Sequence, residues 1–343
     1  MPNLIYILII ATIILLLSRP LAIYVGLVDK PNHRKFHKNP TPLIGGISIV
    51  ITIVIYLLLN PNILPKSNIF IFCIVALAIT GSLDDKYNLP VQLRLCVQAL
   101  VATIFLFNSG LSIGSIYPLI LVDNTLIQYI DYMLTAIVVI VLINAYNMSD
   151  GIDGSLSVIT FTPLISLTLL FYINHQINMS YLCIIIIASM IPYALLNANM
   201  LLINKKVFIG DAGSMTIGFI LTWLSLIYGV NKENLNQDST IFILFYLSAL
   251  PLIDLLSVCL FRIQSGLSPF KADRNHLHHV LLDAGLSEKK TLQVILFLSI
   301  CFSGLGILIN IYKVPIVVTI PLTIATIMIY IISLNKIRNV SKK

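Results

Sequence analysis

Long apolar runs separated by short polar segments make up most of this chain. The runs do not alternate apolar and polar residues with a period of two, so they predict helices rather than the strands of a membrane barrel. Crossing the hydrocarbon core of a bilayer takes about 20 apolar residues. We expect eleven transmembrane helices, near 3–24, 43–60, 69–83, 92–109, 127–145, 156–174, 180–199, 207–229, 240–261, 292–311 and 314–334. The expected fold is therefore an all-α polytopic membrane protein.

Two of the apolar segments have special features. The segment 111–122 is apolar but short and contains Pro118, so we expect a loop or an interfacial stretch there. Pro251 lies inside the run 240–261, and we expect it to bend that helix and to open a groove for a lipid tail.

The composition agrees with a membrane protein. The chain has 343 residues, of which 58% are hydrophobic and 10% charged, and a mean hydropathy of +0.98. Little of the chain is left for a soluble domain, so we expect one integral membrane domain over 1–343, with 262–291 as its longest cytoplasmic loop. The five cysteines lie in apolar runs and show no disulfide spacing.

The net charge of +7 follows from membrane topology. Of the 21 Lys and Arg residues, all but Lys66, Lys232 and Lys313 fall in one alternate set of loops or at the span ends that border it. The positive-inside rule assigns that set to the cytoplasm, the N-terminus to the outside and the C-terminus to the cytoplasm. Because this charge lies in short loops between spans, we expect no nucleic-acid partner. The first span lacks a cleavage site, and we interpret it as an uncleaved helix.

The first polar motif is a basic loop that ends in prolines and paired glycines. Arg34, Lys35 and His37 precede the segment 40–46, which contains Pro40, Pro42, Gly45 and Gly46. The cations could bind an anionic ligand. A simple stop-transfer loop is the alternative.

The second motif is an acidic pair at a helix end. Asp84 and Asp85 follow the run 69–83, and Arg94 lies at the start of the next run. Two neighbouring carboxylates repel each other, which can prepare one of them for proton transfer. A solvated helix-end turn is the alternative.

The third motif, NAYNMSDGIDG, is rich in oxygen ligands. Asn144 and Asn147 are three residues apart, as are Asp150 and Asp153, so each pair can share a helix face. Carboxylate and amide oxygens suit a hard cation such as Mg²⁺. A polar hairpin between spans is the alternative.

The last two motifs combine a glycine-rich helix start with a histidine loop. Asp211 lies in VFIGDAGS, where a glycine-rich turn entering a helix can hold phosphate and where Asp211 could instead be an N-cap. Arg274, His276, His278 and His279 lie in SPFKADRNHLHH. That loop contains no cysteine and no Glu between its histidines, which disfavours zinc. It fits pyrophosphate binding better, and a solvated basic loop is the alternative.

These motifs, in the order DKPNHRKFH, PTPLIGG, GSLDDKYNLPVQLRLCVQ, NAYNMSDGIDG, VFIGDAGSMTIGF and SPFKADRNHLHH, resemble the polyprenyl-phosphate N-acetylhexosamine-1-phosphate transferases of glycosyltransferase family 4. The resemblance covers residues 26–287. The final motif is more similar to the branch that uses UDP-N-acetylglucosamine and undecaprenyl phosphate than to the branch that uses UDP-MurNAc-pentapeptide.

The resemblance implies a reaction and a set of roles. A sugar-1-phosphate moves from the UDP-sugar to the lipid phosphate, releasing UMP, with Mg²⁺ or alternatively Mn²⁺. This is the first membrane step of a cell-surface glycan pathway, on the cytoplasmic side of a bacterial cytoplasmic membrane, in contact with membrane lipid. Another UDP-N-acetylhexosamine stays open, as does a homodimer. By resemblance, the metal ligands are Asp211 and Asn147, the base or nucleophile is Asp84 with support from Asp85, and the residues near metal and nucleotide sugar are Asp150 and Asp153. The resemblance also assigns donor binding to Arg274, His276, His278 and His279. Their chemistry and position make five further residues candidates for substrate binding: Arg34, Lys35, His37, Arg94 and Asn144.

Two other function classes fit part of the pattern. A transporter for anionic solutes would also place polar residues in membrane helices, but it predicts polar groups near mid-bilayer and some access from both sides of the membrane. Here the outward loops are short and nearly free of motifs. A non-catalytic structural membrane protein would need neither the oxygen-rich motif nor the histidine loop.

Overall fold

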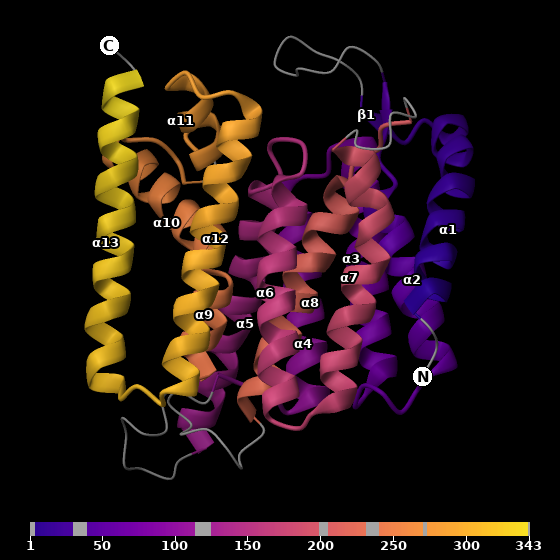
Figure 1. Cartoon of the computed structure of the whole chain (residues 1–343), viewed down its shortest axis with the longest axis horizontal. Coiled ribbons are helices and arrows are strands. Elements are labelled where there is room, and N and C mark those ends of the chain that lie inside the picture. The colour runs from indigo at the N-terminus through magenta and orange to yellow at the C-terminus, as the bar shows by residue number, and fades with distance from the viewer. Residues whose placement is uncertain are drawn as a thin grey trace. The chain divides into compact units, whose positions relative to one another are not determined.

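The computed structural model describes residues 4–29, 40–113, 125–198, 205–230, 240–269 and 273–341, which are mostly helical (Figure 1). The elements are α1 (Leu4–Val25), β1 (Val28–Asp29), β2 (Thr41–Pro42), α2 (Gly45–Leu59), α3 (Ser67–Tyr87), α4 (Val91–Ser109), α5 (Thr125–Met148), α6 (Ser155–Ile173), α7 (Ile177–Asn197), α8 (Gly210–Val230), α9 (Thr240–Leu247), α10 (Ala249–Gln264), α11 (Leu277–Asp283), α12 (Glu288–Ile311) and α13 (Ile316–Ser341).

The prediction of an all-α polytopic membrane protein is confirmed. Within the described ranges, nine helices are long and apolar enough to cross a membrane, or ten if the bent pair α9–α10 is one span. Only 17% of the 18-residue apolar stretch of α1 is buried, and only 11% of that of α13. Most of their apolar side chains are therefore available to lipid. The predicted orientation of the two termini stays a prediction.

The predicted span 43–60 forms a shorter helix than expected. α2 has 15 residues, a length of about 22 Å at a rise of 1.5 Å per residue, against a hydrocarbon core of about 30 Å. It begins only at Gly45 because the preceding residues are extended. β2 pairs antiparallel with β1, and Leu43 forms a parallel bridge with Phe208.

The predicted span 240–261 is strongly bent. Helices α9 and α10 meet at an angle of 82° at a break next to Ser248. Pro251 lies in the first turn of α10, where a residue without an N–H leaves no helical hydrogen bond missing. The expected bend is present, and the break in the helix lies three residues before Pro251. The groove expected there stays a prediction.

The chain divides into two compact units, which we describe separately. Unit 1 comprises 1–110, 136–143 and 167–220, and unit 2 comprises 111–135, 144–166 and 221–343. The expectation of a single transferase domain stays a prediction.

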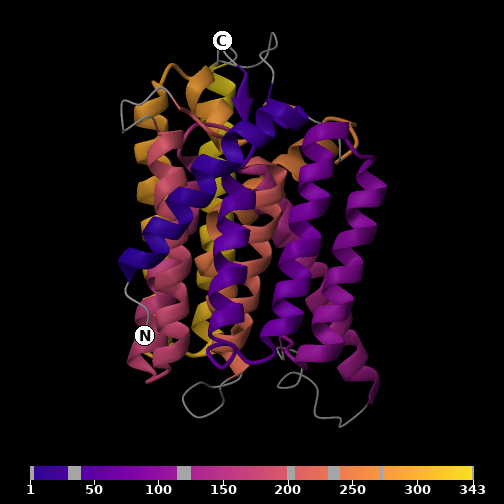
Figure 2. The same cartoon turned by 90° about the vertical axis from the view of Figure 1, so that its right-hand side faces the viewer.

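In unit 1, α1 packs against α2 and α7, and α3 packs against α2 and α4. Figure 2 shows the indigo α1 lying across this group. Phe219 of α8 lies in the core, with its ring centroid 6.4 Å from that of Phe70 and 5.8 Å from that of Phe105. Helices can approach closely where glycine replaces a larger side chain. A Cβ on Gly218 would lie 2.9 Å from Ile143 Cα, so α8 and α5 are in such contact here.

In unit 2, α12 packs against α9, α10 and α11, and α13 packs against α10 and α11 (Figure 1). Buried polar pairs join its helices: Tyr228 donates to Asn310 Oδ1 at 2.7 Å, and the hydroxyls of Tyr146 and Ser248 are 3.2 Å apart. The segment 262–291, predicted to be a loop, contains the helix α11. Of the predicted interfacial segment 111–122, the residues after 113 lie outside the described ranges.

Candidate functional site

One group of predicted site residues gathers in unit 1, and we call it the carboxylate cluster: Asp84, Asp85, Arg94 and Asp211. Asp84, on the last turns of α3, is 6% exposed and accepts from Leu89 N–H at 2.8 Å through Oδ1. Its Oδ2 accepts from Arg94 Nη1 at 2.5 Å. The same Arg94 nitrogen lies 3.9 Å from Asp211 Oδ2. One guanidinium therefore links the acidic pair to the acid of the glycine-rich motif.

Asp85 holds the beginning of α8. Asp211 is the second residue of that helix, and its N–H donates to both carboxylate oxygens of Asp85, at 3.1 and 3.0 Å. A carboxylate at a helix N-terminus satisfies an otherwise unpaired donor and interacts favourably with the helix dipole. The capping carboxylate thus comes from α3, and the N-cap alternative for Asp211 is wrong.

Close backbone contacts bring three sequence motifs together in unit 1. The N–H groups of Gly45 and Gly46 donate to the carbonyls of Phe208 and Ile209 at 2.9 and 2.8 Å. A Cβ on Gly46 would lie 2.8 Å from Ile209 O and closer still to Gly213. On the other side, a Cβ on Gly81 would overlap the backbone at Asp211–Ala212. The paired glycines therefore serve as packing positions for the start of α8.

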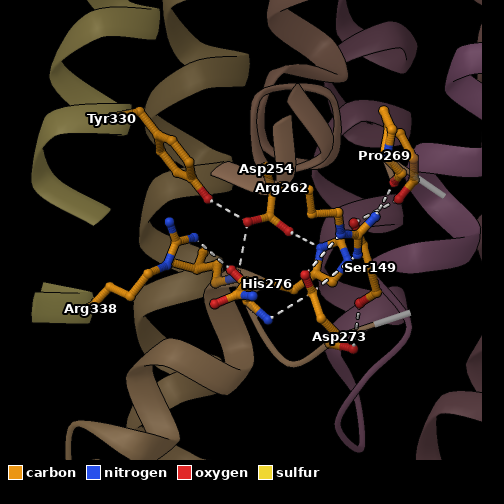
Figure 3. Close-up of polar contacts among 12 residues, drawn as sticks. Ser149, Asp254, Arg262, Pro269, Asp273, His276, Tyr330 and Arg338 are labelled. Atoms are coloured by element: carbon orange, nitrogen blue, oxygen red, sulfur yellow. Dashed lines mark hydrogen bonds and ion pairs between the residues drawn. The ribbon is translucent and has the colours of Figure 1, made fainter. Parts of the chain in front are cut away.

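A second group lies in unit 2, and we call it the histidine cluster: Asp254, His276, His278 and His279. Figure 3 shows Asp254 and His276 pointing toward each other. His276 Nδ1–H donates to Asp254 Oδ2 at 2.8 Å, and both side chains are buried. The His276 and His278 rings are parallel within 4°, with centroids 6.0 Å apart. His278 and His279 centroids are 4.2 Å apart. The alternative of a solvated basic loop therefore does not hold for the histidines, because His276 and His278 are buried and His279 is half-buried.

The third motif contacts the histidine cluster. A Cβ on Gly151 would lie 2.5 Å from His278 Cδ2 and closer to Nε2, so the glycine backbone lies directly against the imidazole. Burial of His278 disfavours its charged form, and the neighbouring His279 adds to this, so the pKa of His278 is lowered to about 3. Burial also lowers the pKa of His279, whose Nδ1 has no hydrogen-bond partner among the described residues.

The other residues of the third motif lie around one turn. Ser155 Oγ donates to the carbonyls of Ser149 and Ile152, at 3.2 and 2.8 Å, and Gly154 has a φ of +80°. This turn joins α5 to α6. Asp150 is exposed, and the half-buried side chains are those of Asn144, Asn147 and Asp153.

An ion pair closes the segment before the histidines. Arg262 is 1% exposed and donates to Asp273 through Nε and Nη2, at 2.8 and 3.0 Å, and to Pro269 O at 2.5 Å. Although partial burial raises it, hydrogen bonds from Arg262 and Asn275 lower the pKa of Asp273 to about 2. In the sequence, Arg262 is only one of the positive charges that indicate the cytoplasmic side. The structure shows that it also holds this segment together. The exposed Arg274 lies 3.5 Å from Asp283 and belongs to a surface pair.

The structure therefore brings the predicted residues together in two groups. Asp84, Asp85, Arg94 and Asp211 meet in unit 1, and the histidines meet the NAYNMSDGIDG turn in unit 2. Arg34, Lys35 and His37 lie outside the described residues. The predicted metal ligands Asp211 and Asn147 belong to different units, and their pairing stays a prediction.

The sequence analysis did not identify Asp254, Tyr330 and Arg338. Asp254 interrupts the apolar run 240–261, and an ionisable residue inside a membrane span is by itself a sign of function. That signal could have identified Asp254. Tyr330 and Arg338 have no comparable signal, since tyrosine and arginine near a helix end are also typical of membrane interfaces.

Metal binding can be judged from the donor chemistry. The Asp211 side chain is 34% exposed and offers carboxylate oxygens, which suit Mg²⁺. Within the part of the chain that the structure describes, no three His, Cys, Asp or Glu side chains form a metal-ligand group. Mg²⁺ commonly uses one or two carboxylates together with water and substrate phosphates, so a single well-placed Asp is compatible with it.

Comparison with known proteins gives the family. The profile of glycosyl transferase family 4 matches residues 67–229. A Yersinia pestis protein named undecaprenyl-phosphate alpha-N-acetylglucosaminyl 1-phosphate transferase is 34% identical over 307 residues, which cover 89% of this chain and 83% of the relative. Relatives of the same name from Salmonella typhi and Haemophilus influenzae are each 33% identical over 89% of this chain, which covers 82% and 85% of their lengths. The resemblance inferred from the motifs is confirmed, and this multi-pass membrane protein belongs to glycosyl transferase family 4.

Proposed function

We propose that this protein transfers N-acetylglucosamine-1-phosphate from UDP-N-acetylglucosamine to undecaprenyl phosphate, at the cytoplasmic face of a bacterial cytoplasmic membrane. The observation that supports it best is the carboxylate cluster, in which Arg94 contacts both Asp84 and Asp211. The names of the bacterial relatives support the same transfer. The lipid-linked pyrophosphoryl sugar is the class of product on which a cell-surface glycan is built.

The reaction balances without any further reactant. An oxygen of the lipid phosphate forms a bond to the β-phosphorus of the UDP-sugar, and the bond from that phosphorus to the bridging oxygen breaks. The bridging oxygen leaves with the α-phosphate as UMP. Positioning and charge stabilisation are the main contributions that a protein can make to such a transfer.

Magnesium binding at Asp211 is part of the proposal. Bound Mg²⁺ would neutralise charge on the donor pyrophosphate. The Asp85 carboxylate holds the Asp211 N–H and thereby restrains the backbone that carries the proposed ligand. Asn147 is the second protein ligand expected from the sequence, and Asp150 and Asp153 are expected near the nucleotide sugar.

Asp84 is better suited to positioning than to nucleophilic attack. Both of its oxygens accept hydrogen bonds, one from Leu89 N–H and one from Arg94, and its side chain is 7% exposed. Attack on phosphorus would require a carboxylate oxygen to leave these donors. A lipid phosphate is already largely ionised at neutral pH, since its second pKa is about 6. We therefore propose direct attack by the lipid phosphate, with Asp84 orienting Arg94.

The histidine cluster is proposed to hold the donor. Imidazole N–H groups can donate to phosphate or sugar oxygens. Contact between Gly151 and His278 gives this role a structural basis, because it links the histidine motif to the turn that carries Asp150 and Asp153.

The main test uses purified full-length protein with undecaprenyl phosphate, Mg²⁺ and a panel of UDP-sugars that includes UDP-N-acetylglucosamine, UDP-N-acetylgalactosamine and UDP-MurNAc-pentapeptide. We expect UMP release and a lipid product with UDP-N-acetylglucosamine, and their loss in Asp211→Asn and in the presence of EDTA. Turnover of another sugar alone would reject the proposed donor, and solute uptake without UMP release would reject the enzyme.

A rapid-quench experiment separates the two routes of transfer. Donor labelled in the β-phosphate is mixed with protein in the absence of undecaprenyl phosphate. We expect no labelled protein. Label retained on the wild-type chain but absent from Asp84→Asn would instead show a covalent intermediate and overturn direct attack.

A further inference from the structure

Asp254 is a buried carboxylate that accepts hydrogen bonds from the beginning of α11 and from α13. It lies on α10, is 4% exposed, and receives His276 Nδ1–H on Oδ2 at 2.8 Å. Its Oδ1 accepts from Leu277 N–H at 2.9 Å and from the Tyr330 hydroxyl at 3.0 Å. A buried charge is costly unless it is well hydrogen-bonded, and here both oxygens have donors.

The hydrogen bond to Asp254 determines how the His276 ring is oriented. The carboxylate accepts from Nδ1, so Nδ1 carries a proton, and Nε2 lies on the opposite edge of the ring. A carboxylate that holds one imidazole nitrogen in this way selects the tautomer and leaves the other nitrogen for a ligand. The His278 ring lies parallel to that of His276, with the two centroids 6.0 Å apart.

Helix α13 supplies the outer support of this arrangement (Figure 3). Tyr330 reaches Asp254 directly, and Arg338 Nη2 donates at 2.9 Å to the carbonyl of Asn275, the residue before His276. Arg338 is 2% exposed, and its Cζ lies 4.2 Å from the centroid of the Phe261 ring on α10. Helix α13 therefore contacts the backbone of the histidine motif, at Asn275, and also Asp254, the acid that supports His276.

We propose that Asp254 is the positioning residue for His276 in donor binding, and that Tyr330 and Arg338 make α13 part of this positioning. The proposal rests on the proposed function, since it takes His276 as a residue that contacts the UDP-sugar. It adds to that function a set of residues that act through His276 without touching the substrate themselves.

Asp254→Asn changes the chemistry of this contact with little change in shape. The Asn carbonyl oxygen can keep the Oδ1 position, with its donors Leu277 N–H and Tyr330 O–H. The NH₂ group then replaces Oδ2 and faces His276 Nδ1. Because NH₂ donates, Nδ1 must accept, and the ring proton moves to Nε2. The variant therefore inverts the His276 tautomer.

The kinetic test measures the KM of each substrate separately. In Asp254→Asn we expect the KM for the UDP-sugar to rise by about 10–100-fold, as is typical for partners that orient a ligand, with the KM for undecaprenyl phosphate unchanged. Tyr330→Phe removes one hydrogen bond and should raise the donor KM by roughly 3–10-fold. Tyr228→Phe is the matched control, because its buried hydroxyl donates to a different acceptor, Asn310 Oδ1.

A double-variant cycle tests whether Asp254 acts through His276. In a His276→Gln background, Asp254→Asn should change the donor KM by less than about 3-fold, because the residue it orients is already gone. Equal effects of Asp254→Asn in the two backgrounds, or equal increases in the KM values of both substrates, would overturn the proposal in favour of a general structural role.

A second readout does not depend on activity. Nitrogen-15 NMR of imidazole-labelled protein distinguishes protonated from unprotonated ring nitrogens, and the His276 signals are assigned by their loss in His276→Gln. We expect the proton to move from Nδ1 to Nε2 in Asp254→Asn, and an unchanged spectrum would overturn the positioning. A different outcome is that Asp254→Asn inverts the His276 tautomer but the wild-type protein releases no UMP. That result would support the positioning of His276 by Asp254 and reject the proposed function.

Discussion

Replacing Gly81 with alanine tests how the acidic pair and the glycine-rich motif are held together. Gly81 lies on α3, one turn before Asp84, and faces the beginning of α8. An added Cβ would lie 2.5 Å from Ala212 Cα and closer still to Asp211 C and Ala212 N. Ordinary contact begins at 3.4 Å, so the two helices would have to separate by about 1 Å. The obstructing atoms are helix backbone, which cannot move aside as a flexible side chain can.

That separation should affect both stability and catalysis. Overpacking of this kind costs about 1–3 kcal/mol in the free energy of unfolding. A shift of about 1 Å in catalytic groups lowers rates on the order of 10²-fold. Because Arg94 contacts both Asp84 and Asp211, moving one helix from the other changes the two contacts unequally. We expect kcat/KM to fall by roughly 10–100-fold in Gly81→Ala.

The assay compares UMP release and thermal unfolding of the detergent-purified variant with those of a matched glycine. Gly304→Ala lies inside α12, where an added Cβ has no neighbour within 4 Å. Because alanine is about 1 kcal/mol more favourable than glycine inside a helix, this control should be neutral or slightly stabilising. Wild-type kcat/KM in Gly81→Ala, with an unfolding temperature equal to that of Gly304→Ala, would refute the close α3–α8 contact.

Three further predictions concern the two clusters and the Arg262–Asp273 ion pair. Asp85→Asn keeps one acceptor for the Asp211 N–H but loses its charge, whereas Asp85→Ala loses both, so we expect UMP release to fall further in the Ala variant, and equal activities would contradict the capping role. The folded pKa of His278 is about 3, below its ordinary value of 6.5, so between these values the unfolded chain binds a proton that the folded chain does not. Stability should therefore fall as the pH falls from about 6.5 toward 3, and thermal unfolding of His278→Gln should show a smaller difference between pH 7.5 and pH 5 than the wild type. Arg262→Lys loses the two-point contact with Asp273 and should lower the free energy of unfolding by about 1–3 kcal/mol, which chemical denaturation in detergent can measure; an unchanged midpoint would show that the pair is not structural.

Most of the fold could be predicted because lipid leaves few choices. Backbone groups in hydrocarbon must be hydrogen-bonded within their own segment, so each long apolar run became a helix close to its expected bounds. Two helices depart from those bounds. α2 is short because residues 41–43 pair with other segments, and the span with Pro251 bends at Ser248. Hydropathy does not show the first cause, because it depends on pairing with distant segments. The bend was expected from Pro251, but its position at Ser248 was not.

The motif chemistry was also visible in the sequence, because acids, amides and imidazoles stand out in an apolar chain. Their partners were not visible. Asp84 and Asp85 look equivalent in the sequence, yet one contacts Arg94 and the other holds the first turn of α8. The repulsion expected between them is relieved by different donors from different helices.

The sequence by itself determined the class of protein, the family and the residue types at the site, because hydrophobic length and motif order are local properties of the chain. Tertiary structure decided which groups act on one another. Asp254, Tyr330 and Arg338 acquire a role only because a bent helix and the C-terminal helix meet at His276. The physical reason is that hydrogen bonds depend on distances of about 3 Å, and such proximity between residues far apart in the chain is set by packing.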